Sequence, residues 1–272
     1  MNFLDNIDFS RDEDIICLTN KEGIQIYDTK TFTLKMKLDP FRIGLSGDVT
    51  KCKLAYNSQL LAFTIIENEI IESKQQKILY NDTKVKKHSL IVYDLKNYEI
   101  IGKITMKNLI EINDFLFTKY FIIIMIENKN KALLFKTSNL EFFKSISNAE
   151  MGTIAYSDTY TIPPPLSKKK EKVAKQPQPP SFKQNRCVIA YKDIENKKVI
   201  KLIQFIFDDK GNNILASKNS EITTEFGSVG LKYIGFVSSY LLVSSNLGNK
   251  VHMYNIFTGQ FKYCLFLGNF PY

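Results

Sequence analysis

Short apolar runs alternate with polar turn residues along most of the chain, a pattern typical of β-strands joined by tight turns. In the run GIQIYD (Gly23–Asp28), Ile24 and Ile26 fall on one face of a predicted strand. Gln25 and Tyr27 fall on the other face. The run Phe121–Ile126 is apolar throughout, as expected of a strand buried on both faces. Gly and Asn stand between paired runs in NKEG, DDKGNN and NLGN, where they accept the positive φ angles of hairpin turns. The sequence therefore predicts an all-β protein.

A longer order repeats along the chain: an apolar strand, a tight turn, a second strand, the pattern hydrophobic-x-hydrophobic-Tyr/Phe-Asp/Asn/Lys, and a final strand. The clear copies span Ile7–Leu38, Val49–Met106, Ile110–Ile146, Met151–Ile200 and Leu231–Leu267. Before the last copy, Ile200–Ser217 supplies only the first two strands of a further one. Without insertions a copy has about 35–40 residues, close to the roughly 40–45 residues of a four-stranded WD-type blade. We predict a WD40-type β-propeller that fills one domain, residues 1–272, with six to seven blades, one of them short.

The net charge of +9 is concentrated in one segment. Pro163–Arg186 contains six Lys, one Arg and one Glu, a net charge of +6, together with six of the eight prolines. Such a composition cannot bury enough apolar surface to offset the loss of chain entropy, so we predict a disordered insertion at 163–186. It is either a solvated linker or an electrostatic contact with an anionic surface, to which each Lys contributes about 1 kcal/mol. The candidate membrane-contacting residues are Lys168, Lys169, Lys170 and Lys172. A second insertion, 67–87, is predicted to be a solvated loop.

Residues that commonly carry catalysis or bind metals are sparse and scattered. The cysteines and histidines are Cys17, Cys52, Cys187, Cys264, His88 and His252. Without a CxxC pair, this distribution predicts buried reduced thiols in a cytosolic protein rather than a metal site or a disulfide framework. No GxSxG, phosphate-cradling glycine loop or HExxH pattern occurs, so we expect neither an enzyme nor a cofactor.

The sequence also indicates where in the cell the protein is expected. No leader of basic, apolar and then small residues opens the chain, so we expect no signal peptide. The most apolar window has an uninterrupted core of Tyr120–Ile126, far short of the roughly 20 residues of a membrane-spanning helix. We expect a cytoplasmic protein.

Several stretches resemble, in order, the PROPPINs, which are WD-repeat propellers that bind phosphoinositides in autophagy. FSRDEDIICLTNKEGIQIYDT is similar to their opening hairpin, and DPFRIGLSGDVTKCKLAYNSQLLAF (Asp39–Phe63) to the Pro-Phe stretch that leads into their second blade. LLVSSNLGNKVHMYNI is similar to their sixth blade. The resemblance is one of order and pattern across nearly the whole chain. It implies a phosphoinositide-associated scaffold that recruits autophagy partners and lies peripherally on autophagic or endosomal membranes.

The chain departs from the family at the lipid-binding motif. The PROPPINs carry Phe-Arg-Arg-Gly, in which each arginine serves a separate headgroup pocket through paired hydrogen bonds to phosphate. The corresponding place here is EFGSVG, and an alternative alignment at FLGN also lacks arginine. By resemblance, the candidate phosphoinositide-binding residues are Phe226, Gly227, Ser228, Ser244, Ser245 and His252. For His252, a polar residue on a strand face is the simpler interpretation. The resemblance thus implies degenerate headgroup pockets.

The chain departs from the family in two further features, the loop that contacts the membrane and the closure of the propeller ring. The loop that the family presses into the bilayer shrinks to IFTGQ, and no seventh blade follows within the chain. A propeller of about six blades closes differently, binds a partner at the gap, or comes from a truncated gene model. Two functions stay open: a phosphoinositide-directed scaffold in autophagy, and a WD-repeat platform for protein–protein interactions without specific lipid binding. We expect no nucleic-acid partner.

Overall fold

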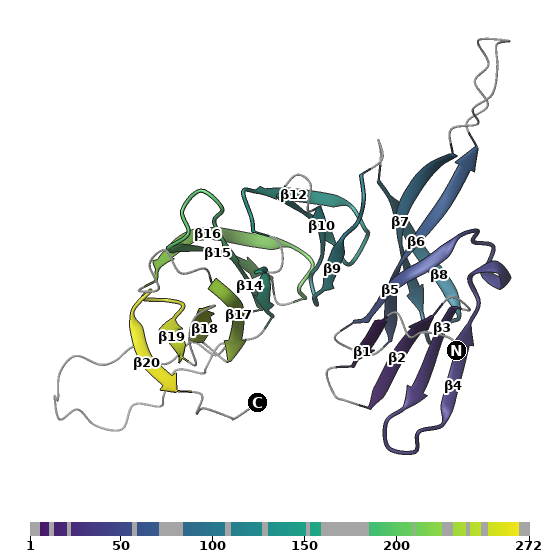
Figure 1. The fold of residues 1–272 in the computed structure, drawn as a ribbon, viewed down its shortest axis with the longest axis horizontal. Helices are drawn as coiled ribbons and strands as arrows, with labels where there is room; N and C mark the ends of the chain where they lie inside the picture. The colour runs from purple at the N-terminus through teal and green to yellow at the C-terminus, as the bar shows by residue number, and fades with distance from the viewer. Residues whose placement is uncertain are drawn as a thin grey trace, which may run out of the picture. The chain divides into compact units, whose positions relative to one another are not determined.

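The protein is described by a computed structural model. It describes residues 6–10, 14–20, 23–55, 59–70, 84–106, 110–126, 130–150, 153–158, 185–208, 210–224, 231–237, 240–245 and 250–266. These residues form β-strands and one short 3-10 turn, η1 (Pro40–Ile43), so the all-β prediction is confirmed (Figure 1). The chain divides into two compact units, Met1–Ser147 and Asn148–Tyr272. The single domain over residues 1–272 stays a prediction.

The first unit contains three four-stranded antiparallel sheets, and in each the strands pair in chain order. The first sheet consists of β1 (Asn6–Phe9), β2 (Ile15–Asn20), β3 (Gly23–Asp28) and β4 (Leu34–Leu38). The second sheet consists of β5 (Asp48–Leu54), β6 (Leu60–Ile70), β7 (Lys84–Asp94) and β8 (Glu99–Thr105). The third sheet consists of β9 (Asp114–Phe117), β10 (Phe121–Ile126), β11 (Lys131–Lys136) and β12 (Phe142–Ser147).

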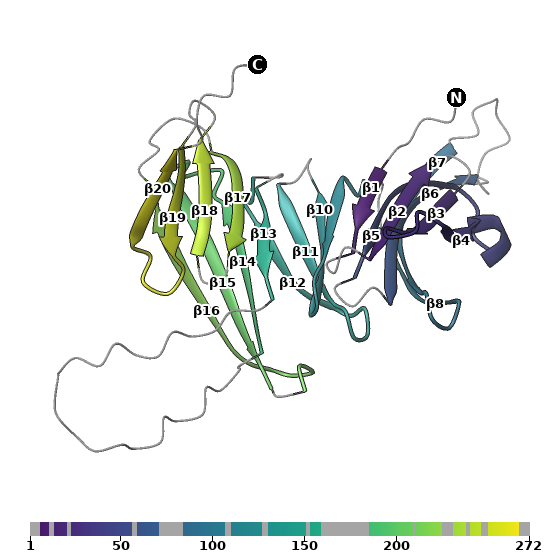
Figure 2. The ribbon, with the colours of Figure 1, turned by 90° about the horizontal axis from the view of Figure 1, so that it is seen from below.

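The second unit contains two sheets of the same kind. The fourth sheet consists of β13 (Ala155–Ser157), β14 (Arg186–Lys192), β15 (Val199–Phe207) and β16 (Ile214–Thr223). The fifth sheet consists of β17 (Leu231–Val237), β18 (Tyr240–Ser245), β19 (Lys250–Asn255) and β20 (Phe261–Phe266). Figure 2 shows the four strands of the fifth sheet side by side in chain order. Each described sheet is thus a meander, the arrangement expected of a propeller blade.

One local structure ends the third strand in all five sheets. There the pairing with the fourth strand shifts register at an aromatic residue, which is Tyr27, Tyr93, Phe135, Phe207 or Tyr254. The next residue begins the turn, and at Asp28, Asp94 and Asn255 its side-chain oxygen accepts hydrogen bonds from the backbone N–H groups two and three residues on. The repeated aromatic-Asp/Asn pattern is therefore a β-bulge followed by an Asx turn.

The same turn places one residue in the left-handed region before the fourth strand. In four sheets this residue is the fourth after the start of the turn, namely Phe32 (φ 53), Tyr98 (φ 58), Leu140 (φ 57) or Gly259 (φ 67). In the fourth sheet it is one position earlier, at Gly211 (φ 75), the third residue after Asp208. Gly adopts this conformation freely, whereas other residues lose about 1–2 kcal/mol. The sheets of the first unit thus hold bulky side chains at a position where the geometry favours Gly.

Apolar side chains fill the space between adjacent sheets within each unit. One buried cluster lies between the first and second sheets and another between the second and third. In the second unit, a buried cluster joins the fourth and fifth sheets. All six residues of β10 are buried, which confirms the buried strand predicted for Phe121–Ile126. Among the residues that the structure describes, no helix is long and apolar enough to span a membrane.

The strands of the fourth sheet correct the predicted blade boundaries. The sequence pattern predicts Ile200–Ser217 to be the first half of a short blade, but these residues lie in β15 and β16 and complete the fourth sheet. The cause is CVIAYK (187–192), which has the pattern of a third strand but forms β14, the second strand. The bulge and the turn come one strand later, at Phe207 and Asp208. The described residues therefore form five complete sheets rather than a series containing a short blade.

The two predicted insertions fall partly on described residues. Residues 67–70 and 84–87 of the segment 67–87 pair with each other and extend β6 and β7. Residues 71–83 between them lie outside the described residues. Of the Pro/Lys-rich segment 163–186, only the last two residues are described, and Arg186 begins β14. This insertion therefore enters the fourth sheet between its first and second strands.

Candidate interaction site

Seven of the ten residues predicted to contact lipid lie outside the described residues. They are Phe226, Gly227, Ser228, Lys168, Lys169, Lys170 and Lys172. Their part in binding stays a prediction. The other three, Ser244, Ser245 and His252, lie on two neighbouring strands of the fifth sheet, β18 and β19.

The pairing of β18 with β19 separates Ser244 from His252. His252 lies opposite Val243, and Ser244 lies opposite Val251. Directly opposed residues share a face of the sheet and successive residues alternate between faces, so Ser244 and His252 are on opposite faces.

His252 is 8% exposed and belongs to an aromatic cluster. Its ring lies edge-on to the ring of Phe261, with centroids 5.2 Å apart, and its Nδ1 is 3.5 Å from the hydroxyl oxygen of Tyr254. Tyr254 is itself 1% exposed and packs against Phe261. This packing supplies a structural role for the imidazole within the fifth sheet.

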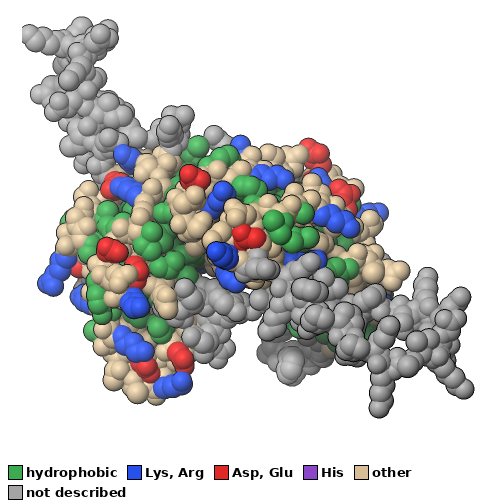
Figure 3. All heavy atoms as spheres, turned by 180° about the vertical axis from the view of Figure 1, so that it is seen from behind, with side chains coloured by type: hydrophobic (Ala, Val, Ile, Leu, Met, Phe, Trp, Pro, Cys, Tyr) green, Lys and Arg blue, Asp and Glu red, His purple; other side chains and the backbone are tan. Residues whose placement is uncertain are grey.

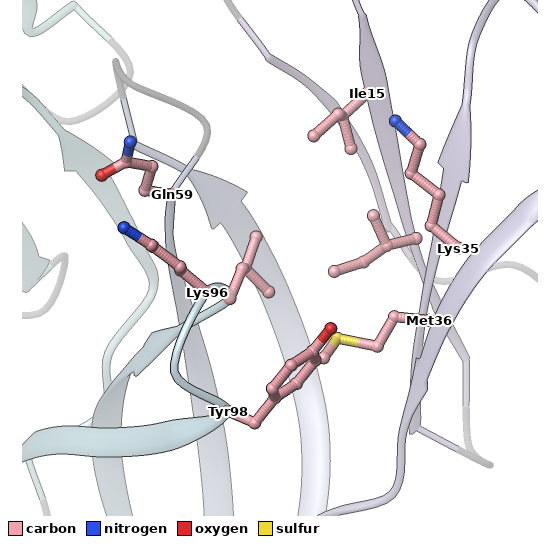
Figure 4. A pocket seen from close by; sticks show the side chains of 8 residues that line it. Ile15, Lys35, Met36, Gln59, Lys96 and Tyr98 are labelled. Atoms are coloured by element: carbon pink, nitrogen blue, oxygen red, sulfur yellow. The ribbon is translucent and has the colours of Figure 1, made fainter.

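A pocket of about 330 Å³ lies in the first unit, between the first and second sheets. Its lining consists of Ile15 of β2, Ile26 of β3, Lys35 and Met36 of β4, and Gln59, Leu95, Lys96 and Tyr98 of the second sheet's turns. Figure 4 shows the ring of Tyr98 beside the side chain of Met36, and Lys96 near Gln59. The hydrophobic pattern and the motifs of the sequence do not predict this pocket.

The turn between β7 and β8 supplies one wall of the pocket. The side chain of Asp94 accepts hydrogen bonds from the backbone N–H groups of Lys96 and Asn97, at 2.7 and 3.0 Å. The N–H of Tyr98 donates to the carbonyl oxygen of Asp94 at 2.9 Å, which closes the turn with Tyr98 in its left-handed conformation. The N–H of Leu95 donates to the carbonyl oxygen of Gln59 at 2.8 Å and joins this turn to the neighbouring hairpin. The Tyr98 side chain is held at the surface, 68% exposed.

The floor of the pocket is apolar and its rim is charged. Ile26 is buried, and Ile15, Met36 and Leu95 pack against the core between the two sheets. At the rim, the ammonium group of Lys35 lies 2.8 Å from the Asp28 carboxylate and holds the pKa of that carboxyl well below its usual range. The ammonium group of Lys96 makes no ion pair with any residue that the structure describes. An apolar floor beneath an aromatic side chain, with polar groups at the rim, suits an apolar side chain of a bound chain.

Charge elsewhere on the surface is mixed. On the face shown in Figure 3, acidic and basic side chains are interspersed over the described residues. Among the described residues, no group of three or more His, Cys, Asp or Glu side chains could hold a metal ion. The pocket is thus a place in the first unit where exposed aromatic, apolar and polar groups converge.

The signal for this pocket in the sequence is the segment YDLKNY. It shares the aromatic-Asp pattern with the other third strands, and the register of that pattern places Tyr98 at the left-handed turn position. The same turn position holds Phe32 in the first sheet, Leu140 in the third and Gly259 in the fifth. Tyr98 is therefore recognisable as a bulky residue of this turn once the repeat is aligned by its turns.

No protein-family model and no curated protein matches the sequence. Among solved structures, the chain is similar to Hsv2 from Kluyveromyces marxianus, with a TM-score of 0.61 and 12% identity over 98% of this chain and 62% of that chain. It is also similar to Kluyveromyces lactis Hsv2, with a TM-score of 0.62 and 10% identity over 98% of this chain and 64% of that chain. A third likeness is to the β-propeller domain of Cps50 (Swd1) from Myceliophteria thermophila, with a TM-score of 0.52 and 9% identity over 96% of this chain and 73% of that chain.

The chain spans 62% and 64% of the length of these two Hsv2 chains. At identities near 10% such likenesses concern the fold. The five described meanders agree with it, since each has the strand order of a propeller blade. In fold, the chain is a divergent PROPPIN-like β-propeller, as the resemblance of its sequence predicts.

Proposed function

We propose that this chain is a propeller scaffold that binds a short segment of a partner protein in the pocket between its first and second sheets. The observation that supports this most directly is the pocket of about 330 Å³ with an apolar floor and the exposed ring of Tyr98 at its edge. Aromatic side chains beside well-packed apolar pockets contribute most of the binding energy in many protein interfaces. The function is the protein–protein platform that the sequence analysis leaves open.

The strained backbone at Tyr98 supports the same proposal. A non-Gly residue in the left-handed region costs about 1–2 kcal/mol, and sites of function retain such residues. In the fifth sheet, Gly259 occupies the equivalent turn position without this cost. Phe32 and Leu140 bear the same cost in the first and third sheets, and of the three bulky residues Tyr98 is the one that lines the pocket. A tyrosine side chain that is 68% exposed gains little from burial in the free protein, so binding is a reason to retain it.

Peptides selected on the purified chain from a random phage-display library test this function. We expect Tyr98→Gly to weaken the binding of selected peptides, measured by fluorescence anisotropy, about tenfold or more, since a central aromatic residue commonly contributes at least ~2 kcal/mol. The variant should fold, because Gly259 occupies the same turn position in the fifth sheet.

Phe32→Gly is the matched control. Phe32 occupies the equivalent left-handed position in the first sheet, is 80% exposed, and does not line the pocket. Its replacement should leave peptide affinity unchanged. Equal affinity of the selected peptides for the wild-type chain and Tyr98→Gly would contradict binding in this pocket.

A second candidate is a scaffold that associates with phosphoinositide-containing membranes in autophagy, with weakened headgroup recognition. It is supported by the fold likeness to Hsv2 and by the net charge of +6 in Pro163–Arg186. Lysines near an anionic surface contribute about 1 kcal/mol each and need no defined pocket. The membrane location, the autophagy role and the lipid contacts all belong to this proposal.

Liposome sedimentation separates specific from nonspecific lipid binding. A headgroup site predicts stronger sedimentation with phosphatidylinositol 3-phosphate than with phosphatidylserine, and a purely electrostatic contact predicts no preference. Deleting Ser167–Lys183 should reduce binding to both lipids. Replacing Gly227 and Ser228 with Arg should create a preference for the phosphoinositide if the headgroup slot is kept. A wild-type chain that sediments with neither lipid contradicts this candidate.

A further inference from the structure

Two cysteines from different sheets meet in the core of the first unit. Cys17 lies on β2 of the first sheet and Cys52 on β5 of the second, 35 residues apart in sequence. Both side chains are 0% exposed, and their Sγ atoms are 2.9 Å apart. The function proposed for the pocket does not use this pair.

The separation of the two sulfur atoms is short for groups that are not bonded. Even carbon atoms, which are smaller, are in optimal contact at about 3.5–4.0 Å. A disulfide bond has an S–S length of about 2.03–2.05 Å. The two thiols, which are free in the structure, therefore need a relative movement of less than about 1 Å to reach bonding distance.

The neighbouring groups make the two thiols unequal. The sulfur atoms of Cys17 and Cys52 share a hydrogen bond in which either can be the donor, and the hydroxyl of Thr19 donates another to the sulfur of Cys52 at 2.7 Å. These bonds lower the pKa of Cys52, against the opposing effect of burial. The hydrogen bond to Cys52, with burial, raises the pKa of Cys17 well above its usual range. Because the thiolate is the nucleophile in thiol chemistry, Cys52 is the sulfur that reacts first.

We propose that Cys17 and Cys52 are a redox-active dithiol, which hydrogen peroxide converts into a disulfide bond that joins the first and second sheets. The Cys52 thiolate attacks one peroxide oxygen, the O–O bond breaks, and the departing hydroxide takes a proton to become water. The resulting sulfenic acid is attacked by the sulfur of Cys17, the S–O bond breaks, and a second water leaves with the proton of Cys17. Two thiols are oxidised by two electrons, and one peroxide is reduced to two waters.

This inference goes beyond what the sequence shows. The scattered cysteines predict buried reduced thiols, and nothing in their spacing pairs Cys17 with Cys52. Their approach depends on the packing of β2 against β5, which belong to separate sheets. Cys187 and Cys264 lie on β14 and β20 of the second unit and serve as internal controls.

Peptide mapping of the full chain after peroxide treatment tests the proposal. The reduced chain is exposed to hydrogen peroxide, the remaining thiols are alkylated in denaturant, and the chain is digested with trypsin without reduction. We expect a cross-linked product of Asp12–Lys21 with Cys52–Lys53, lighter than the sum of its two peptides by two hydrogen atoms. Dithiothreitol should release both peptides, and the oxidised chain should unfold at a higher temperature than the reduced one.

Two variants show whether the bond belongs to this pair. Cys52→Ser should leave Cys17 open to alkylation after peroxide, whereas the double variant Cys187→Ser/Cys264→Ser should give the same cross-linked product as the wild-type chain. Mapping of the wild-type chain decides the matter even where a variant folds poorly. Complete alkylation of Cys17 and Cys52 after peroxide treatment, or linkage of either one to Cys187 or Cys264, would overturn the proposal.

Discussion

His88 on β7 is a buried imidazole whose Nε2 has no hydrogen-bond partner among the described residues. The side chain is 8% exposed, and its backbone carbonyl accepts a hydrogen bond from the N–H of Met106 at 2.9 Å. Burial lowers the pKa of the imidazole below its ordinary value of 6.5, with Lys86 acting in the same direction and Glu111 against it. The native protein therefore holds His88 neutral.

We predict that His88 makes the protein less stable below pH 6.5. Above this pH the imidazole is neutral in both the folded and the unfolded chain, so its contribution to stability is complete. Below it, the unfolded chain takes up the proton first, and the free energy of unfolding falls until the pH has passed through the lower folded pKa. Each unit of difference between the two pKa values corresponds to about 1.4 kcal/mol.

Urea unfolding at pH 7.5 and 5.5 measures this effect. The loss of stability between the two should be smaller in His88→Gln than in the wild-type chain, since glutamine does not titrate. Burial raises the pKa of the Asp8 carboxyl, but this group is present in both proteins, so its contribution cancels in the comparison. An identical loss in both proteins would show that His88 is not the titrating group.

At the scale of the structural elements, the segment that joins the first and second sheets contains two glycines under different constraints. Gly44 ends η1 with φ 78, and a Cβ added there would meet nothing within 4 Å. Gly47 precedes β5 with φ 135, and a Cβ added there would lie 2.3 Å from the carbonyl oxygen of Ile66 on β6. The first position needs only a left-handed backbone, whereas the second also needs the absence of a side chain.

The two alanine variants should therefore differ in stability. Gly44→Ala should lower the free energy of unfolding by about 1–2 kcal/mol, the cost of the left-handed region for a residue with a Cβ. Gly47→Ala should lower it by roughly 3 kcal/mol or more, because backbone strain and overpacking each cost about 1–3 kcal/mol. Urea unfolding followed by circular dichroism measures both. Equal losses would show that the approach of β6 to Gly47 does not constrain the chain.

Much of the element structure could be predicted from the sequence. The alternation in GIQIYD and the apolar run of β10 both follow from local burial patterns and agree with the structure. The error at β14 has a physical cause, because CVIAYK carries the side-chain pattern of a third strand. What identifies the third strand is the bulge and the turn after it, which depend on pairing with a strand further along the chain.

In the whole molecule, most of the net charge lies in one segment, whereas the folded sheets are spread over two compact units. The segment Pro163–Arg186 carries +6 of the net charge of +9, which leaves about +3 for the rest of the chain. The sheets fall into two compact units, each with its own buried clusters. A basic overall composition thus says little about the surface of the sheets, where acidic and basic side chains are interspersed (Figure 3).

The sequence by itself determined the all-β class, the repeat and the propeller fold, because strand burial and turn chemistry are local properties that each copy repeats. It could not locate the pocket at Tyr98, the cysteine pair or the aromatic surroundings of His252. Each of these depends on side chains that different strands bring together. Only the tertiary structure decided them, since the register between strands and the packing between sheets set distances that sequence spacing does not contain.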